Sequence, residues 1–144
     1  MTLLKEFNEY LADLAVFTFK LHNLHWNIKG EQFIPVHKHT EDLYDQAFEF
    51  YDQVAEHIKM NGHDPEVKLE NYLKISHIKE IDSKDFKPSE ALEIVLEDIK
   101  LLRKVATDLR NGSDKEGWFA AVSLFESHVE FFNKEIWFIG ATLG

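Results

Sequence analysis

The sequence has no cysteine, which excludes disulfide bonds, thiolate nucleophiles, zinc fingers and iron–sulfur clusters. Glycine and proline are also scarce, with six and three residues in 144, so little of the chain can form turns. No apolar run approaches the ~18 residues that a membrane-spanning helix needs, and Lys5 and Glu6 interrupt any secretory signal segment. We therefore expect a cytoplasmic protein with no membrane segment. The length is that of one domain, which we expect to cover residues 1–144.

Basic residues are outnumbered by acidic ones. The 16 lysines and arginines stand against 26 aspartates and glutamates, which gives a formal net charge of −10. Such a chain repels a nucleic-acid backbone unless its cations form one patch, and Lys5 is the only cation before Lys20. Histidine, by contrast, is plentiful, with eight residues. Imidazole and carboxylate groups together bind hard and borderline metal ions, so this composition favours metal chemistry.

Apolar residues recur at steps of three and four over four long stretches, which is the spacing of a buried helical face. The four series are Leu3, Phe7, Tyr10, Leu14, Phe17, Leu21, Leu24 and Ile28; Val36, Thr40, Leu43, Ala47, Phe50 and Val54; Leu92, Leu96, Ile99, Leu102, Ala106 and Leu109; and Val122, Phe125, Val129, Phe132, Ile136 and Ile139. No convincing strand interrupts them. We therefore predict an all-α bundle of four long helices.

Glycines and capping residues predict where these helices begin and end. Gly30, Gly62 and Gly112 follow the first three stretches, at the place where a left-handed residue commonly terminates a helix. Ser113, with Glu116 three residues later, has the pattern of a capping box and predicts the start of the fourth helix.

The connections predict the topology of the bundle. Short turns join the first helix to the second and the third to the fourth, so each pair should form an antiparallel hairpin. Residues 62–88 are too many for a turn, and we expect them to run back along the bundle with a short helix near Val67–Ile75. The third helix then starts at the end where the second began. One long crossover of this kind is the ferritin-like arrangement of a four-helix bundle.

The second helix carries a further stripe of residues, about 100° around the helix from its apolar series. The stripe consists of His37, Glu41, Phe48, Asp52 and Glu56. A solvated acidic face is the commoner explanation for any one of its carboxylates, but their alignment beside aromatic residues favours a metal site. His25 lies near the end of the first helix, so an antiparallel hairpin brings it close to His37.

One ion cannot use the whole stripe of a single chain. Glu41 and Asp52 are ~16 Å apart along the helix axis, at about 1.5 Å per residue, whereas ligand bonds are only ~2 Å long. A two-fold axis near the middle of the helix would resolve this, because it places His37 and Glu41 of one subunit opposite the last two carboxylates of its partner. The spacing therefore predicts two identical sites per dimer.

The same residues carry a family resemblance. The chain resembles the Dps-like miniferritins in the segments His25-Trp26-Asn27-Ile28-Lys29-Gly30, Phe33, Val36-His37, Glu41, Tyr44, Asp52 and Ala55-Glu56. The match extends over nearly the whole chain and is specific, because two histidines twelve residues apart followed by spaced carboxylates are rare by chance. That family stores iron and protects DNA during starvation. The resemblance implies a homo-oligomeric shell of twelve ferritin-like subunits that oxidises Fe(II), preferably with hydrogen peroxide, and stores a ferric mineral.

The resemblance also implies the site residues. It assigns iron binding to His25, His37 and Glu41 from one subunit and to Asp52 and Glu56 from the other, across a two-fold interface. Zinc or another divalent ion would be able to occupy the same ligands. Trp26 would lie beside this ferroxidase centre, where an oxidisable ring can quench a radical, although packing in the core or at an interface explains it equally well.

Departures from the family pattern also bear on function. Glu41 stands where Asp is frequent, a change of one methylene group. His57 stands where Arg is usual, and a surface histidine is the simplest expectation for it. After Gly117 the chain has Trp118 and Phe119 where relatives place aspartates that line a pore, so iron must enter past other carboxylates or by a different route.

Other functions fit these residues less well. An ordinary di-iron bundle needs Glu-x-x-His pairs and a hemerythrin-like protein needs His-x-x-x-His, and the sequence contains neither. A DNA-coating nucleoid protein of the same fold, without ferroxidase chemistry, is the main alternative, but with so acidic a chain we expect no appreciable DNA affinity at physiological salt. A bundle that buries the acidic stripe in an interface without metal would leave unpaired charges, which is costly.

Overall fold

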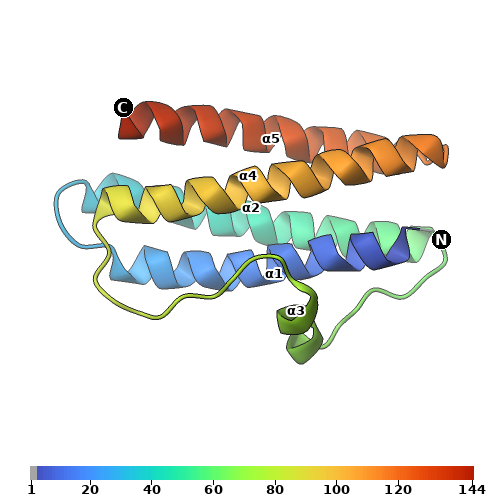
Figure 1. The fold of residues 1–144 in the computed structure, drawn as a ribbon, viewed down its shortest axis with the longest axis horizontal. Helices are drawn as coiled ribbons and strands as arrows, with labels where there is room; N and C mark the ends of the chain where they lie inside the picture. The colour runs from blue at the N-terminus through green and yellow to red at the C-terminus, as the bar shows by residue number, and fades with distance from the viewer. Residues whose placement is uncertain (1–2) are drawn as a thin grey trace.

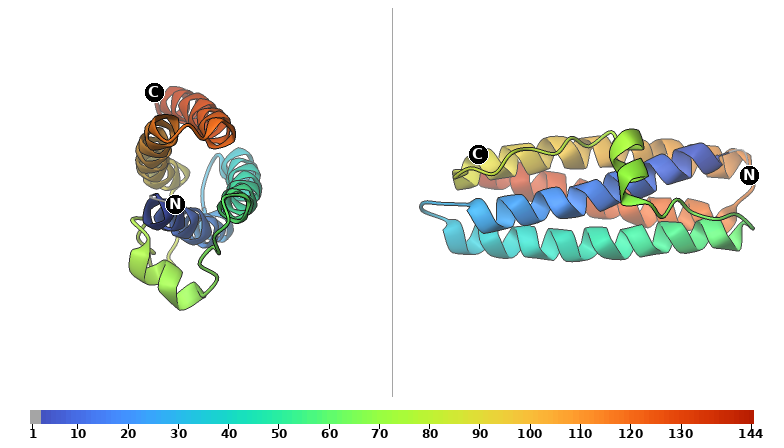
Figure 2. Two further views of the ribbon diagram at one scale, coloured as in Figure 1. Left: turned by 90° about the vertical axis from the view of Figure 1, so that its right-hand side faces the viewer. Right: turned by 90° about the horizontal axis from the view of Figure 1, so that it is seen from below.

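The computed structural model describes residues 3–144, which form four long helices and one short one. The helices are α1 (Leu4–Asn27), α2 (Phe33–Met60), α3 (Leu69–Ile75), α4 (Pro88–Lys115) and α5 (Phe119–Leu143). The long helices lie side by side with nearly aligned axes, and α3 sits outside the bundle against α1 (Figure 1, Figure 2). This confirms the predicted all-α, ferritin-like four-helix bundle. In the described part of the chain, no helix combines the length and apolar character needed to cross a bilayer.

The crossover between α2 and α4 has the predicted course. Figure 1 shows that α4 begins at the end of the bundle where α2 begins, and that the two helices of each hairpin, α1–α2 and α4–α5, run in opposite directions. Two backbone hydrogen bonds of 2.9 Å, from Lys29 to Phe86 and from Phe86 to Asn27, fasten the end of the crossover beside the end of α1. The short helix starts at Leu69, two residues later than expected, and ends at Ile75 as predicted.

The apolar series of α1 and α2 lie in the core as predicted. Every residue of both series is buried except Leu3, which is half-buried. α1 is buried far more widely than its series requires, because residues 10–18 are all buried without a break. The crossover and α3 cover the face of α1 that points away from the bundle (Figure 2), so α1 is buried on more sides than α2.

The predicted end of α4 is wrong. Gly112 and Ser113 lie inside α4, which continues to Lys115, so Ser113 is a buried helical residue and caps no helix. Gly117 is the left-handed residue that ends α4, with φ +75°, and the backbone N–H of Trp118 donates to the Ser113 carbonyl at 2.9 Å. Gly112 ends no helix but packs closely against Leu3, since a Cβ at this position would lie 2.9 Å from Leu3 Cδ1.

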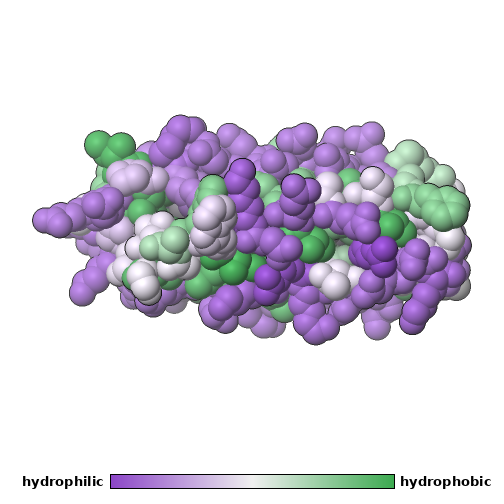
Figure 3. All heavy atoms as spheres, turned by 90° about the horizontal axis from the view of Figure 1, so that it is seen from above, coloured by the Kyte–Doolittle hydropathy of each residue, from purple (hydrophilic) through white to green (hydrophobic). Residues whose placement is uncertain are grey.

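The buried face of α5 is also displaced from the prediction. Phe125, Phe132 and Ile139 are buried as predicted, whereas Val122, Val129 and Ile136 are only half-buried, and Ala121, His128 and Glu135 are buried in their place. The buried face of α5 is thus rotated about the helix axis relative to the predicted face. Apolar side chains remain at the surface, including Phe119, which is 83% exposed. Figure 3, which looks onto the side of α5, shows apolar side chains among the polar ones. Apolar spacing alone mispredicts this face because two of its core residues are polar.

His128 is buried because it has two hydrogen-bond partners inside the bundle. Tyr10 Oη lies 2.8 Å from Nδ1, and Gln53 Oε1 lies 2.9 Å from Nε2, so a neutral ring accepts from the tyrosine and donates to the amide. The ring also stacks on Phe50, with 3.7 Å between centroids. Burial, and then the charge of nearby His57, lowers the pKa of His128 to about 3. His57 itself is half-buried rather than on the surface as expected, and burial lowers its pKa.

His128 should make the stability of the fold depend on pH. Its folded pKa of about 3 lies below the unfolded value, so its contribution is complete above about pH 6.5 and falls by about 1.4 kcal/mol per pH unit below that. We expect His128→Phe, which keeps an aromatic ring against Phe50, to flatten the fall of the urea midpoint between about pH 6.5 and about pH 4. His63→Phe, in the half-exposed segment after α2, is the control and should keep the parent slope. Identical slopes for all three proteins would contradict a neutral buried His128.

Two glycine substitutions test the corrected end of α4. Gly117→Ala should lower the free energy of unfolding by about 1 kcal/mol or more, because alanine is strained at positive φ. Gly112→Ala should stay within about 0.5 kcal/mol of the parent, because helix propensity favours alanine and only the flexible tip of Leu3 must move. Chemical denaturation measures both. The reverse order of the two variants would place the end of α4 at Gly112.

Candidate metal centre

The α1–α2 hairpin brings His25 and His37 into direct contact. Their rings stack with 3.6 Å between centroids and an interplanar angle of 15°. His25 Nδ1 donates to the main-chain carbonyl of His37 at 2.7 Å, and His37 Nδ1 donates to the carbonyl of His25 at 2.8 Å. A carbonyl oxygen can only accept, so Nδ1 carries the proton in both neutral rings. Both Nε2 atoms are thereby left with a lone pair for a metal ion.

The surroundings of His25 favour the neutral ring that a metal requires. Burial lowers the pKa of His25, and the neighbouring imidazoles of His37 and His22 act in the same direction. The hydrogen bond to the His37 carbonyl and the charge of Glu41 act in the opposite direction without reversing the result. Thr40 Oγ1 lies 3.1 Å from His25 Nδ1 and supports the ring from inside the hairpin.

Glu41 and Tyr44 extend this corner one turn along α2. Burial, and then the negative charges of Glu41 and Asp45, raises the pKa of Tyr44. The Tyr44 ring meets the edge of His25, with 5.2 Å between centroids at 88°. Glu41 is half-exposed and therefore open to a second chain. His25, His37 and Glu41 thus lie at one corner of the bundle and are the residues of the first candidate half-site.

The sequence prediction missed His22, which lies one turn before His25. Its ring lies flat against Tyr44, with 3.8 Å between centroids, and its Nδ1 atom is 2.7 Å from the carbonyl of Thr18. Because that carbonyl can only accept, a neutral His22 ring has the same tautomer as the other two imidazoles, with the proton on Nδ1. Its spacing of three residues from His25, which places both on one helical face, was the available signal.

Asp52 and Glu56 form a separate pair further along α2. Both are exposed, and the hydrogen bond with Asp52 together with its negative charge raises the pKa of Glu56. The structure does not bring this pair to the histidines within one chain. Across residues 3–144, no three histidine, aspartate or glutamate side chains are close enough together to hold one ion. Within one chain, the pair Asp52 and Glu56 is thus a second candidate half-site, separate from the first.

Exposed aromatic side chains lie beside and between the two half-sites. Phe48, in the middle of α2, is 63% exposed, and Trp26, next to His25, is 69% exposed. Trp26 is thus no core residue of the chain, and its ring lies tilted against His22 with 5.5 Å between centroids. Large apolar side chains that remain exposed together mark interaction surfaces.

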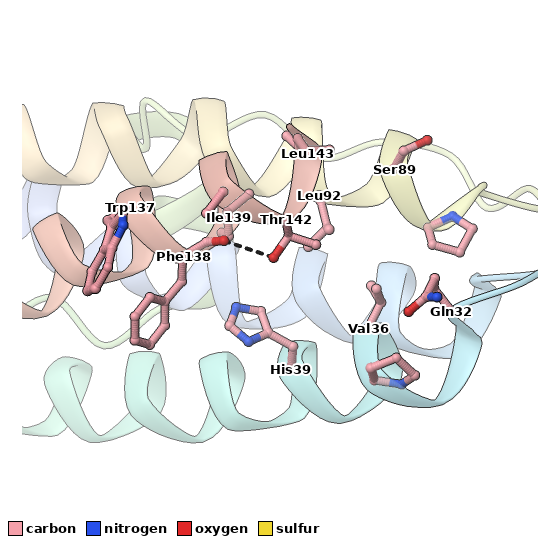
Figure 4. A pocket seen from close by; sticks show the side chains of 13 residues that line it. Gln32, Val36, His39, Ser89, Leu92, Trp137, Phe138, Ile139, Thr142 and Leu143 are labelled. Atoms are coloured by element: carbon pink, nitrogen blue, oxygen red, sulfur yellow. Dashed lines mark hydrogen bonds between the residues drawn. The ribbon is translucent and has the colours of Figure 1, made fainter.

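A cavity of about 760 Å³ lies elsewhere, between the starts of α2 and α4 and the end of α5. Figure 4 shows the His39 ring reaching from α2 toward Phe138 of α5. His39 Nε2 is 2.9 Å from Glu135 Oε2, which explains why a carboxylate of α5 is buried. Neither His25 nor His37 lines this cavity, so it is distinct from the candidate metal centre.

Comparisons with known proteins agree with this architecture. The ferritin-like domain matches residues 4–144. The chain is 36% identical over 132 residues to the DNA protection during starvation protein of Helicobacter pylori, covering 92% of each chain. Its structure is similar to that of Helicobacter cinaedi CAIP, with a TM-score of 0.96 and 33% identity over 99% of both chains. It is also similar to zinc-soaked Dps from Listeria innocua, with a TM-score of 0.93 and 31% identity over 98% of this chain and 96% of that one.

The two imidazoles should make metal binding depend on pH. Protons compete for the Nε2 lone pairs, so we expect the affinity for Co(II) to fall once the pH drops below about 6. The lowered pKa of His25 delays this loss relative to an ordinary histidine. Titration calorimetry between about pH 5 and about pH 8 measures the effect. An affinity that stays flat over this range would indicate a site made of carboxylates alone.

Proposed function

This chain belongs to the ferritin-like family as a Dps-like miniferritin, and on that premise we propose that it oxidises Fe(II) and stores the ferric product. The family stores iron and protects DNA. The observation that carries the proposal is the reciprocally hydrogen-bonded pair His25 and His37, whose Nε2 lone pairs are fixed for ligation. Imidazole mixed with carboxylate suits iron, zinc and similar ions.

In the proposed site, two chains meet across a two-fold axis through the middle of α2. His37 and Glu56 have the same midpoint along the helix as Glu41 and Asp52, between Gln46 and Ala47. Antiparallel pairing of two α2 helices about that midpoint therefore matches both pairs at once. Phe48 lies next to the axis, where its exposed ring would be covered by the partner. Each completed site would contain His25, His37 and Glu41 of one chain with Asp52 and Glu56 of the other.

The proposed substrates are Fe(II) and hydrogen peroxide. Two Fe(II) ions give up one electron each, the O–O bond of one peroxide breaks, and two protons complete two water molecules. Because both electrons enter the same peroxide, one-electron reduction to hydroxyl radical is avoided. The neutral imidazoles bind the ions, and the carboxylates balance the charge that increases on oxidation. Trp26, exposed beside His25, would sit at the interface as an oxidisable ring for radicals that escape.

We further propose that twelve chains assemble into a closed, cytoplasmic shell that holds the mineral. Protection of DNA would then come from removal of iron and peroxide. Coating of DNA by the protein is the alternative, and a net charge of −10 weighs against it. Phe119, exposed where an aspartate-lined pore would be expected, favours another route for iron into the shell.

Mixing two inactive variants tests both the chemistry and the sharing of the site. His37→Ala and Asp52→Ala should each oxidise Fe(II) with peroxide far more slowly than the parent, since every site lacks one ligand. When the two are unfolded together and refolded at equal ratio, half of the dimers are mixed, and each mixed dimer has one intact site. About a quarter of all sites should therefore regain activity, which stopped-flow absorbance measures.

The matched control is a mixture of His37→Ala with His25→Ala. Both lesions fall on the same half-site, so mixing should restore nothing. Native mass spectrometry verifies that mixed dimers formed in both experiments. Equal recovery in the two mixtures, or none in the first, would refute a site shared between chains, and parent-like rates for both single variants would refute the ligand assignment.

A further inference from the structure

A second polar cluster lies where the crossover passes α1, far from the candidate metal centre. Asp13 of α1 is fully buried, and its Oδ1 atom accepts hydrogen bonds from Ser76 Oγ at 3.0 Å and from the backbone N–H of His77. Its Oδ2 atom lies 2.9 Å from His77 Nδ1. The buried carboxylate thus fixes both the position of the crossover and the orientation of one imidazole.

This orientation presents His77 Nε2 to a second carboxylate. Because Nδ1 donates to Asp13, Nε2 is free to bind a cation, in the manner of histidines whose other nitrogen is held by a carboxylate in metal sites. Glu9, one turn before Asp13 on α1, places Oε2 3.7 Å from that nitrogen. Both side chains can be reached from solvent, with 43% of His77 and 24% of Glu9 exposed.

The distance of 3.7 Å between His77 Nε2 and Glu9 Oε2 indicates whether a metal ion fits between them. It is too long for a hydrogen bond. Two donors that bind one tetrahedral ion through bonds of about 2.0–2.2 Å lie about 3.4 Å apart. With the same bond lengths, the observed 3.7 Å corresponds to a donor–metal–donor angle near 125°. By contrast, His39 Nε2 and Glu135 Oε2 are only 2.9 Å apart, which leaves no room for an ion between them.

We propose that His77 Nε2 and the Glu9 carboxylate bind a divalent transition-metal ion, of which zinc is the representative, with water in the remaining positions. Imidazole with carboxylate is a donor set for zinc and similar borderline ions. Glu9 precedes His25 by sixteen residues of α1, which is about 24 Å along the helix axis, so this site is independent of the proposed iron site. The bound ion joins α1 directly to the crossover and adds to the attachment that Asp13 provides.

Equilibrium dialysis against zinc at about pH 7.5, where free imidazole is neutral, tests the proposal. We expect His77→Gln and Glu9→Gln each to bind one zinc ion fewer per chain than the parent, with at least a tenfold loss of affinity at this site. The matched controls are Glu6→Gln, which removes a charge from the same helix, and His63→Gln, which removes a histidine from the same crossover. Both controls should keep the parent zinc count. Iron oxidation should be unchanged in all four variants.

Two further measurements keep the result unambiguous. Zinc should raise the melting temperature of the parent and of both controls more than it raises that of Glu9→Gln. The Glu9→Gln variant therefore tests the site even if His77→Gln folds poorly. In a chain that also carries His37→Ala, Glu9→Gln should still lower the zinc count by one ion per chain, so failure of the proposed iron site would not affect the outcome. If the zinc count is the same with and without the Glu9 and His77 side chains, the two residues hold no ion and the proposal is wrong.

Discussion

The reciprocal hydrogen bonds between His25 and His37 are the constraint on which the candidate metal centre depends. Each imidazole donates from Nδ1 to the main-chain carbonyl of the other residue, at 2.7 and 2.8 Å. The two bonds fix the end of α1 against the start of α2, the stacking of the rings and the position of both lone pairs. Any displacement of one helix along the other would break both bonds and reorient both ligands together. The ligand geometry is therefore a property of the hairpin rather than of flexible side chains.

The remainder of the fold covers α1 and leaves one face of α2 free. The crossover returns over the outer side of α1, where Asp13 holds Ser76 and His77, and Asn8 accepts a hydrogen bond from the backbone N–H of Glu66 at 2.9 Å. α2 meets the crossover at Tyr51, whose hydroxyl lies 2.7 Å from that of Tyr72 in α3, but Phe48, Asp52 and Glu56 stay exposed. The topology thus leaves this face of α2 accessible to the second chain that the proposed site requires.

Apolar spacing predicted the parts of the fold whose core is apolar, and failed where polar residues enter the core. The series of α1 and α2 and the crossover follow from the sequence because solvent exclusion of aliphatic and aromatic side chains determines them. The face of α5 does not, because His128 and Glu135 are buried only through partners on other helices. The same holds for the site. The hairpin makes the proximity of His25 and His37 predictable, whereas the tautomer of each ring depends on a carbonyl twelve residues away, and the pairing of Asp13 with His77 spans 64 residues.

In the proposed dimer, the charges of the two half-sites would connect metal binding to assembly. In the single chain, the hydrogen bond between Asp52 and Glu56 raises the pKa of Glu56, so this pair already opposes a second negative charge. Pairing two α2 faces as proposed would add Glu41 of the partner to the same site, and three carboxylates without a cation would repel one another at the interface. In the proposed dimer, a divalent ion would remove that repulsion and would bind fully only to the paired chains, so it would stabilise the pair by the free energy of its own binding. By the same linkage, contacts that hold the pair without metal, such as those available to Phe48 and Trp26, would raise the affinity of the site for iron. The exposed aromatic residues would then offset the repulsion within the acidic stripe whenever the ion had left the site for the mineral.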